Sequence, residues 1–266
     1  MRLASNNLLQ GVKVQARTIR SLMLRDMMMR HGRDNIGFGW VILEPMILTV
    51  GVMIVWTVAA GGLKGKGGLN VVELVLTGYM PLTLWRHMTN PSVMLFRRSV
   101  ALLYHRQISI FDILFSKLFL EFIGATAALC FVWTTLFLIG IVSPVSDFGL
   151  LVVGWLMMAL LGLAGGSLIA ALTERWEAAE RFVQPSQYLM IPMSGAFFLL
   201  DWVPPWAQEA LLWNPMVHCY EVFRAGYFGP PLTFHYDFSY FFSAVFVLLF
   251  LGLLSVHGIR HRIQIS

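Results

Sequence analysis

Residues 40–60, WVILEPMILTVGVMIVWTVAA, form a mostly apolar run whose single charged side chain is Glu44. About 20 apolar residues make a helix long enough to cross the hydrocarbon core of a bilayer. Pro45 falls near the start of the run, where a helix has no intrahelical N–H bond to lose. The run therefore predicts a membrane-spanning helix.

The whole chain has the composition of a membrane protein. It has 266 residues, of which 58% are hydrophobic and 12% charged, with a mean hydropathy of +0.71. Soluble globular proteins carry about twice that share of charge. The pattern predicts an all-α polytopic membrane protein with six transmembrane helices and no room for a soluble catalytic domain, the further spans lying near residues 71–95, 113–142, 150–172, 182–200 and 238–256.

Three of these spans have unusual features. The span at 71–95 carries Glu73, Arg86 and His87, which at membrane depth are expected to face protein or a wet cavity rather than lipid. The span at 150–172 contains GLAGGS, residues 162–167, whose small side chains predict close helix contact. Pro185 and Pro192 are expected to interrupt the span at 182–200.

The N-terminal region predicts an amphipathic helix from Leu8 to about Met29. Apolar residues recur there at three- and four-residue steps, and basic residues follow a separate stripe. Such a helix is expected to lie in the membrane surface, although packing on a partner protein is an open alternative. No continuous apolar segment follows the first charges, so a cleaved signal peptide is not expected. The predicted organisation is a single transmembrane domain over 1–266, with an interface helix in 1–36 and the six spans in 37–266.

The basic residues predict the orientation. Six spans bring both termini to one side, and fifteen basic residues fall on that side against three on the other. Basic residues favour the cytoplasmic side of a membrane. Both termini are therefore expected in the cytoplasm, where the fifteen are Arg2, Lys13, Arg17, Arg20, Arg25, Arg30, Arg33, Arg97, Arg98, Arg106, Lys117, Arg175, Arg181, Arg260 and Arg262, opposite Lys64, Lys66 and Arg224.

The segment before the last span is expected to face outward. Residues 201–235 are rich in aromatic side chains and include LLWNPMVHCYEVFRAGYFGP, residues 211–230. Indole and phenol rings favour the membrane interface, so we expect a re-entrant helical hairpin that lies there through Trp202, Trp206, Trp213, Tyr220 and Tyr227. The polar residues Asn214, His218, Glu221 and Arg224 follow helical spacing and share one face, for which a structural role is favoured over contact with a ligand.

Sequence motifs for enzymatic chemistry are missing. The chain has neither G-x-S-x-G nor H-E-x-x-H, and GGLKGKGGLN at 61–70 lacks the spacing of a nucleotide-binding loop. We therefore expect no catalytic residue, no metal site, no nucleic-acid partner and no cofactor bound by this chain. An ion-coupled secondary transporter remains an alternative, because Glu44, Glu73 and Arg86 could form an ion path.

Several motifs together resemble a known family. These are the basic amphipathic start, G-x-x-W-x-x-L-E-P at Gly37–Pro45, the basic loop after the second span, and W-N-P-x-x-H followed by E-x-x-R in residues 213–224. In this order and spacing the chain resembles, over nearly its whole length, the permease subunit of type-2 ABC exporters. Among these it is most similar to the capsular polysaccharide export permeases of Gram-negative bacteria.

The resemblance implies a homodimer in the bacterial inner membrane, joined to two copies of a separate ABC ATPase that binds ATP and Mg. It also implies a lipid-linked polysaccharide as substrate, and periplasmic and outer-membrane export proteins as further partners. Permeases for O-antigen, teichoic acid or lipo-oligosaccharide are the alternatives within the family.

The resemblance further implies roles for individual residues. A coupling helix that contacts the ATPase corresponds to residues 99–110, with Ser99, Leu103, Tyr104, Arg106 and Ile110. The lipid phosphate has candidate partners in Arg17, Arg20 and Arg25, for which contact with ordinary headgroups is equally open. A sugar path needs aromatic faces for stacking, and its candidates, each of which also fits core packing or the interface, are Trp40, Trp56, Tyr79, Trp85 and Tyr188.

Overall fold

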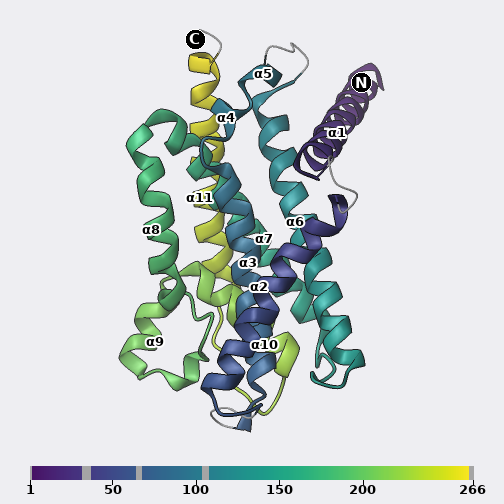
Figure 1. The fold of residues 1–266 in the computed structure, drawn as a ribbon. Coiled ribbons are helices and arrows are strands. Elements are labelled where there is room, and N and C mark those ends of the chain that lie inside the picture. The colour runs from purple at the N-terminus through teal and green to yellow at the C-terminus, as the bar shows by residue number, and fades with distance from the viewer. Residues whose placement is uncertain (1, 32–36, 64–67, 104–107, 264–266) are drawn as a thin grey trace.

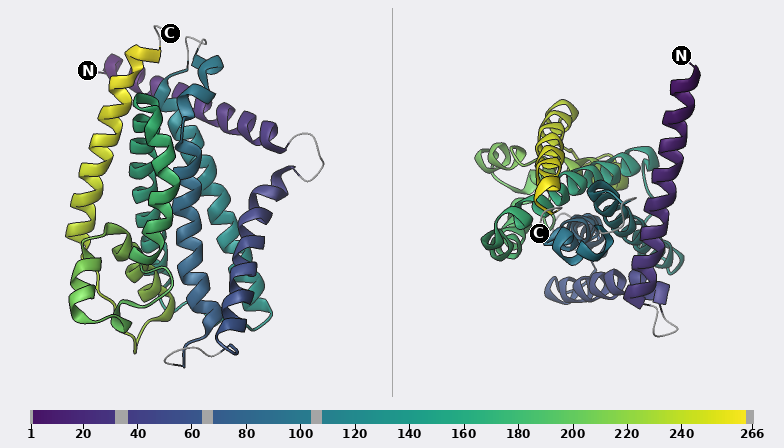
Figure 2. Two further views of the ribbon diagram at one scale, coloured as in Figure 1. Left: turned by 60° about the vertical axis from the view of Figure 1, so that its left-hand side comes forward. Right: turned by 90° about the horizontal axis from the view of Figure 1, so that it is seen from above.

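The computed structural model describes residues 2–31, 37–63, 68–103 and 108–263, and every regular element in these ranges is a helix. One long helix, α1 (Arg2–His31), lies across one end of a helical bundle (Figure 2). The helices that run along the bundle are α2 (Gly37–Ala59), α3 (Val71–Thr89), α6 (Ile110–Leu138), α7 (Phe148–Arg175), α8 (Glu177–Met193) and α11 (Phe238–Ile263) (Figure 1).

Short helices lie at the two ends of this bundle. One end, which we call the terminal end, holds α1, both chain termini, α4 (Leu95–Arg98) and α5 (Val100–Leu103) (Figures 1 and 2). The opposite end, the far end, holds α9 (Pro205–Leu212) and the loop that joins α6 to α7. The predicted placement of both termini at one end is confirmed.

Helix length and composition support part of the predicted topology. Helices α6 and α7, and residues 238–259 of α11, are long and apolar enough to cross a membrane, and Met46–Ala59 of α2 is a shorter apolar segment. The helix predicted at the N-terminus is present and begins earlier, at Arg2. Its position in a membrane surface, and six membrane crossings, stay predictions.

Two predicted spans have different bounds in the structure. Helix α3 ends at Thr89 rather than near residue 95, because Pro91 has no N–H with which to continue the hydrogen-bond ladder. Helix α8 begins at Glu177 and runs through Pro185 without interruption. It ends at Met193, one residue after Pro192, so residues 194–199 are not part of a helix.

The core is organised around α7, which packs against α11, α10 (Pro215–Phe228) and α3. Small residues permit these contacts, as the sequence predicts for residues 162–167. A Cβ on Gly162 would lie 2.7 Å from the sulfur of Met88, and one on Gly166 would lie 2.9 Å from the Met88 carbonyl oxygen. Helix α3 therefore approaches α7 closely enough that side chains at these positions would collide with it.

Candidate functional site

Helix α3 is buried over almost its whole surface, and the exceptions are amphipathic or charged. From Val71 to Thr89, the partly exposed residues are Tyr79, Arg86 and His87. Tyr79 and Arg86 are seven positions apart and therefore lie on one face of the helix. Asn90, four positions beyond Arg86, continues this line and is also partly exposed. The accessible face of α3 is therefore a polar stripe.

Helix α8 presents a matching line of side chains beside this stripe. Arg181, Gln184 and Tyr188 are exposed and follow helical spacing. The guanidinium carbon of Arg86 lies 5.5 Å from the centre of the Tyr188 ring, and the Gln184 side-chain amide donates to the Asn90 side-chain oxygen at 3.3 Å. We call this line of six residues the polar seam: Tyr79, Arg86, Asn90, Arg181, Gln184 and Tyr188.

A buried hydrogen bond fixes the register of the two helices below the seam. The side-chain amide of Gln187 donates to the hydroxyl of Thr89 at 3.0 Å, and both side chains are buried. This contact holds α8 against α3 while one side of the seam stays open. Apart from Val183 and Gln187, the residues of α8 are exposed or partly exposed.

Arg86 gives the seam a positive charge in the last turn of α3. Within the described part of the chain, no carboxylate forms an ion pair with its guanidinium. The neighbouring His87 points to another partner, because its Nδ1 lies 3.3 Å from the buried carboxylate of Glu121 in α6. A cation between apolar helices is costly unless water or an anion contacts it. The seam is thus suited to contact with water and to ligands that are anionic or rich in hydroxyl groups.

The structure does not bring together Glu73 and Arg86, two residues of the alternative ion path. The Glu73 carboxylate accepts hydrogen bonds from the backbone N–H and the hydroxyl of Ser143, both at 2.7 Å, near the far end. Arg86 lies thirteen positions further along α3, which corresponds to about 20 Å of helix. Glu73 and Arg86 therefore do not form a common site, and the side chain of Glu44 lies outside the described residues.

The aromatic candidates for a sugar path lie in different environments. Tyr79 and Tyr188 belong to the polar seam, whereas Trp56 stacks on Phe197 with ring centres 5.2 Å apart. Trp85 is buried and turned toward α7, where a Cβ on Gly165 would lie 2.5 Å from its ring. Trp85 is thus a packing residue of the core, and the side chain of Trp40 lies outside the described residues.

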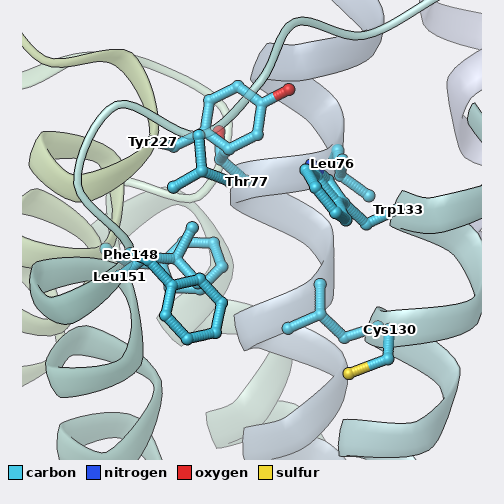
Figure 3. A pocket seen from close by; sticks show the side chains of 10 residues that line it. Leu76, Thr77, Cys130, Trp133, Phe148, Leu151 and Tyr227 are labelled. Atoms are coloured by element: carbon cyan, nitrogen blue, oxygen red, sulfur yellow. The ribbon is translucent and has the colours of Figure 1, made fainter. Parts of the chain in front are cut away.

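A separate cavity of about 80 Å³ lies between α3, α6, α7 and α10 (Figure 3). Leu76, Trp133, Phe148 and Leu151 contribute apolar walls, and Cys130 points into the same space. Hydroxyl groups approach it only from Thr77 and Tyr227. A sugar needs many more hydrogen-bonding partners than this cavity offers, so the polar seam is the better candidate site.

The polar face predicted in residues 214–224 binds backbone of this chain. Arg224 is fully buried, and its guanidinium donates to the carbonyl oxygens of Gly195 at 2.7 Å, Ala196 at 2.6 Å and Phe198 at 2.6 Å. These carbonyls belong to the segment that follows α8. Arg224 thereby attaches the end of α8 to α10.

The remaining residues of that face make similar contacts. Asn214 caps α10 by accepting from the Met216 N–H, and its amide donates to the carbonyl of Met193. His218 accepts from the Asp237 N–H at Nδ1, which leaves Nε2 to donate to the Leu212 carbonyl. Glu221 accepts from the N–H of His235. The face therefore holds α8, α9 and the segment before α11 together.

The interfacial position predicted for two tyrosines is wrong. Tyr220 and Tyr227 are buried, because α10 packs against α7 and α3 rather than lying on the surface. Trp206 and Trp213 are 75% and 76% exposed and remain available for an interface at the far end.

The arginine candidates on α1 divide into two groups. Arg17 and Arg20 are exposed, whereas Arg25 forms an ion pair with Asp26 at 3.1 Å. Asp26 also contacts Lys117 of α6 at 3.1 Å. Burial alone would raise the pKa of Asp26, but Lys117 and Arg25 outweigh it and lower that pKa. This cluster attaches α1 to α6 and leaves Arg17 and Arg20 as the more accessible cations.

The segment predicted as a coupling helix is helical only in part. Helix α5 covers Val100–Leu103, Ser99 precedes it, and Tyr104 and Arg106 lie outside the described residues. Leu103 is half-buried against the core and Ile110 is buried in the first turn of α6, whereas Val100 is 39% exposed. The helix predicted for 99–110 does not reach residue 110 as one element, because Ile108 and Ser109 are not helical and Ser109 forms a capping box with Asp112 that starts α6.

Helix α4, which precedes that segment, is bound to the junction of α7 and α8. The guanidinium of Arg97 lies 2.8 Å from the Glu177 carboxylate and 3.5 Å from that of Glu174, and the N–H of Met94 donates to the Thr173 hydroxyl. These contacts link α4 to the start of α8. Sequence spacing alone could not identify them, because the partners are about 80 residues apart.

Sequence reasoning also missed three members of the seam. Gln184 and Arg181 share the i, i+3, i+7 spacing of Tyr188, so this spacing could have identified them. Asn90 gave no such signal, since it joins the seam only through the position of α8.

Comparison with known proteins agrees with this architecture. Residues 17–228 match the family described as ABC-2 type transporter. The chain is 33% identical over 251 residues to the capsule polysaccharide export inner-membrane protein CtrC of Neisseria meningitidis, covering 94% of each chain. It is 31% identical over 255 residues to BexB of Haemophilus influenzae, a protein of the same description, covering 96% of each. The polysialic acid transport protein KpsM of Escherichia coli is 22% identical over 248 residues, 91% of this chain and 93% of KpsM. With the match extending from α1 to the end of α10, the chain belongs to the ABC-2 type transporter family.

Proposed function

We propose that this chain is the permease subunit of an ATP-driven exporter that moves lipid-linked capsular polysaccharide across the bacterial inner membrane. The observation that carries the proposal is the polar seam, an open line of amide, phenol and guanidinium groups on an otherwise apolar bundle. The names of CtrC and BexB as capsule polysaccharide export proteins support capsule polysaccharide as the substrate class.

The proposed membrane arrangement has six spans, namely α2, α3, α6, α7, α8 and α11. The terminal end faces the cytoplasm, because Arg97, Arg98, Arg175 and Arg181 all lie at or near it. The far end, with α9 and α10 as a hairpin that re-enters from outside, faces the periplasm.

The working unit is a homodimer with two copies of a separate ABC ATPase, which binds ATP and Mg. A second copy of this chain would close the open side of the polar seam, where most of α8 lacks a covering helix. In this arrangement Tyr79 and Tyr188 offer aromatic faces to sugar rings, and Gln184 and Asn90 offer hydrogen bonds to hydroxyls. Stacking tolerates sliding, as a moving polymer requires, because it lacks the directionality of a hydrogen-bond cage.

The ends of the bundle have separate roles in the proposal. At the terminal end, α1 lies in the cytoplasmic membrane surface, where Arg17 and Arg20 contact the phosphate of the lipid anchor. At the far end, the exposed rings of Trp206 and Trp213 face the membrane interface or the periplasmic export proteins.

The proposal is tested by ATP hydrolysis in proteoliposomes that contain this chain and its partner ATPase. Lipid-linked capsular polysaccharide should stimulate hydrolysis, and lipid-linked O-antigen, teichoic acid or lipo-oligosaccharide should stimulate it less. If one of these other glycans stimulated hydrolysis more strongly, that glycan would be the substrate instead of capsular polysaccharide. Hydrolysis indifferent to every lipid-linked glycan, together with transport driven by an ion gradient, would instead support a secondary transporter.

Replacing Arg86 with glutamine should reduce polymer export about tenfold or more, because a charge-assisted contact contributes about 1.5 to 3 kcal/mol. Surface polymer is measured in cells and compared with the amount of permease in the membrane. Arg86→Lys keeps the charge and should retain part of the activity, and Tyr188→Phe keeps the aromatic ring and should export nearly normally. Normal export by Arg86→Gln would show that the polymer does not pass along the polar seam.

Replacing Val100 with aspartate should prevent assembly with the ATPase. Val100 is exposed on α5, so a charge there does not disturb the core, whereas Leu103 packs against it. Co-purification of the two subunits measures assembly, with the membrane content of the permease as a reference. Normal co-purification of Val100→Asp would show that α5 does not form the contact.

A further inference from the structure

A second cleft lies between α7 and α11, and none of its lining residues belongs to the polar seam. Its volume is about 490 Å³, and its walls combine apolar and polar groups. The small residues Ala171, Ser255 and Gly258 leave the space open, while Leu172 and Leu254 form exposed apolar walls. This volume is in the range of sites that bind small molecules.

Arg175 and Trp176 stand at the mouth of the cleft. The Arg175 guanidinium lies 5.3 Å from the centre of the Trp176 ring, and both side chains are exposed. The neighbouring carboxylates, Glu174 and Glu177, contact Arg97 instead. Among the described residues, therefore, no acidic side chain neutralises Arg175.

The cleft lies at the terminal end of the bundle. Arg175 is the last residue of the apolar helix α7, Ile259 lies in the last two turns of the apolar helix α11, and both residues line the cleft. Tryptophan and arginine are typical of the membrane level where headgroups meet acyl chains. Basic pockets between membrane helices on the cytoplasmic side bind anionic lipid headgroups.

We propose that this cleft binds an anionic glycerophospholipid. Its phosphate contacts the Arg175 guanidinium beside Trp176, and part of one acyl chain occupies the space beside Gly258, between Leu172 and Leu254. The charge of Arg175 complements the headgroup, and the apolar walls complement the chain. This site is separate from the proposed path of the glycan and requires neither the ATPase nor a polysaccharide.

The test is lipid binding to the purified chain in detergent. Native mass spectrometry counts bound lipids, and the apparent Tm follows stabilisation, with phosphatidylglycerol as the anionic probe and phosphatidylcholine as the zwitterionic one. Phosphatidylglycerol should remain bound to the wild-type protein and raise its Tm more than phosphatidylcholine does. Inorganic phosphate, which has no acyl chain, should not displace it.

Two variants separate the headgroup from the chain. Arg175→Gln should weaken phosphatidylglycerol binding about tenfold, as expected for the loss of one charge-assisted contact. Gly258→Leu keeps Arg175 but fills the cleft, and the position has room because no atom lies within 4 Å of a Cβ there; it should weaken the binding of long-chain lipid. Arg98→Gln, at an exposed arginine of the terminal end outside the cleft, is the control and should bind as the wild type does.

Each contrary result has a defined meaning. Equal binding by Arg175→Gln and wild type, or equal affinity for the two lipids, would overturn the headgroup contact. Undiminished binding by Gly258→Leu, or displacement of the lipid by inorganic phosphate, would overturn occupation of the cleft by an acyl chain. Because the chain is tested alone, either result leaves glycan export to its own test.

Discussion

Replacing Arg224 with methionine should destabilise the protein by about 3 kcal/mol or more. Arg224 is fully buried and donates to the carbonyl oxygens of Gly195, Ala196 and Phe198. Each buried acceptor that loses its partner costs about 1 to 3 kcal/mol, although the three costs are not additive. Since a protein of this size loses about 2 to 4 °C of Tm per kcal/mol, we expect the apparent Tm in detergent to fall by at least about 6 °C.

Two further variants make this result specific. Arg224→Lys keeps the charge, but a single ammonium cannot reproduce the fork geometry that reaches three carbonyls, so its Tm should lie between those of Arg224→Met and wild type. Arg98→Met, at an exposed position, should change stability by less than about 0.5 kcal/mol. If Arg224→Met and Arg98→Met had the same Tm, the buried guanidinium of Arg224 would not hold the end of α8.

Replacing Gly226 with alanine should have an effect of similar size for a steric reason. A Cβ at this position would lie 2.2 Å from the backbone nitrogen of Leu151 and 2.7 Å from its Cα. Backbone atoms cannot move aside as a flexible side chain can, so α10 would have to separate from α7. The separation would also strain the hydrogen bond from the Asp147 N–H to the Gly226 carbonyl, which measures 2.7 Å.

We expect a loss of about 3 kcal/mol for Gly226→Ala, at the upper end of ordinary overpacking costs. Little folded protein should survive extraction into detergent, and the Tm of the remainder should be lowered. Gly51→Ala is the matched control, because it is also a glycine inside a helix but has no atom within 4 Å of the added Cβ. Its stability should stay the same or rise by up to about 1 kcal/mol. Equal behaviour of the two variants would contradict the close contact of α10 with α7.

The structure explains why the polar residues near the far end do not form a ligand site. Their spacing predicts a shared helix face, and the contacts of Asn214, His218, Glu221 and Arg224 are consistent with a structural role. Their partners could not be predicted, because most are backbone groups of segments that lie 14 to 29 residues away. Backbone carbonyls and N–H groups leave no mark in a sequence.

The environments of the aromatic residues could not be predicted either. Tyr79, Trp85 and Tyr188 are all aromatic residues within predicted spans, so the sequence does not distinguish them. In the structure, Tyr79 and Tyr188 belong to the polar seam, whereas Trp85 packs against Gly165. Tyr220 and Tyr227 belong to an aromatic segment typical of an interface but are buried, because α10 packs against α7 and α3. The rotation of a helix about its own axis decides between these outcomes.

The sequence by itself determined the features that depend on composition and short-range spacing. These are the all-helical membrane class, the placement of both termini at one end, and the close contact of residues 162–167. Only the tertiary structure decided that Arg86 lies beside Tyr188, that Arg224 attaches the segment after α8, and that Arg175 lies over the Trp176 ring at the α7–α11 cleft, where no described carboxylate forms an ion pair with it. Each of these depends on the relative position and rotation of helices that are distant in sequence, and packing of the whole bundle sets both.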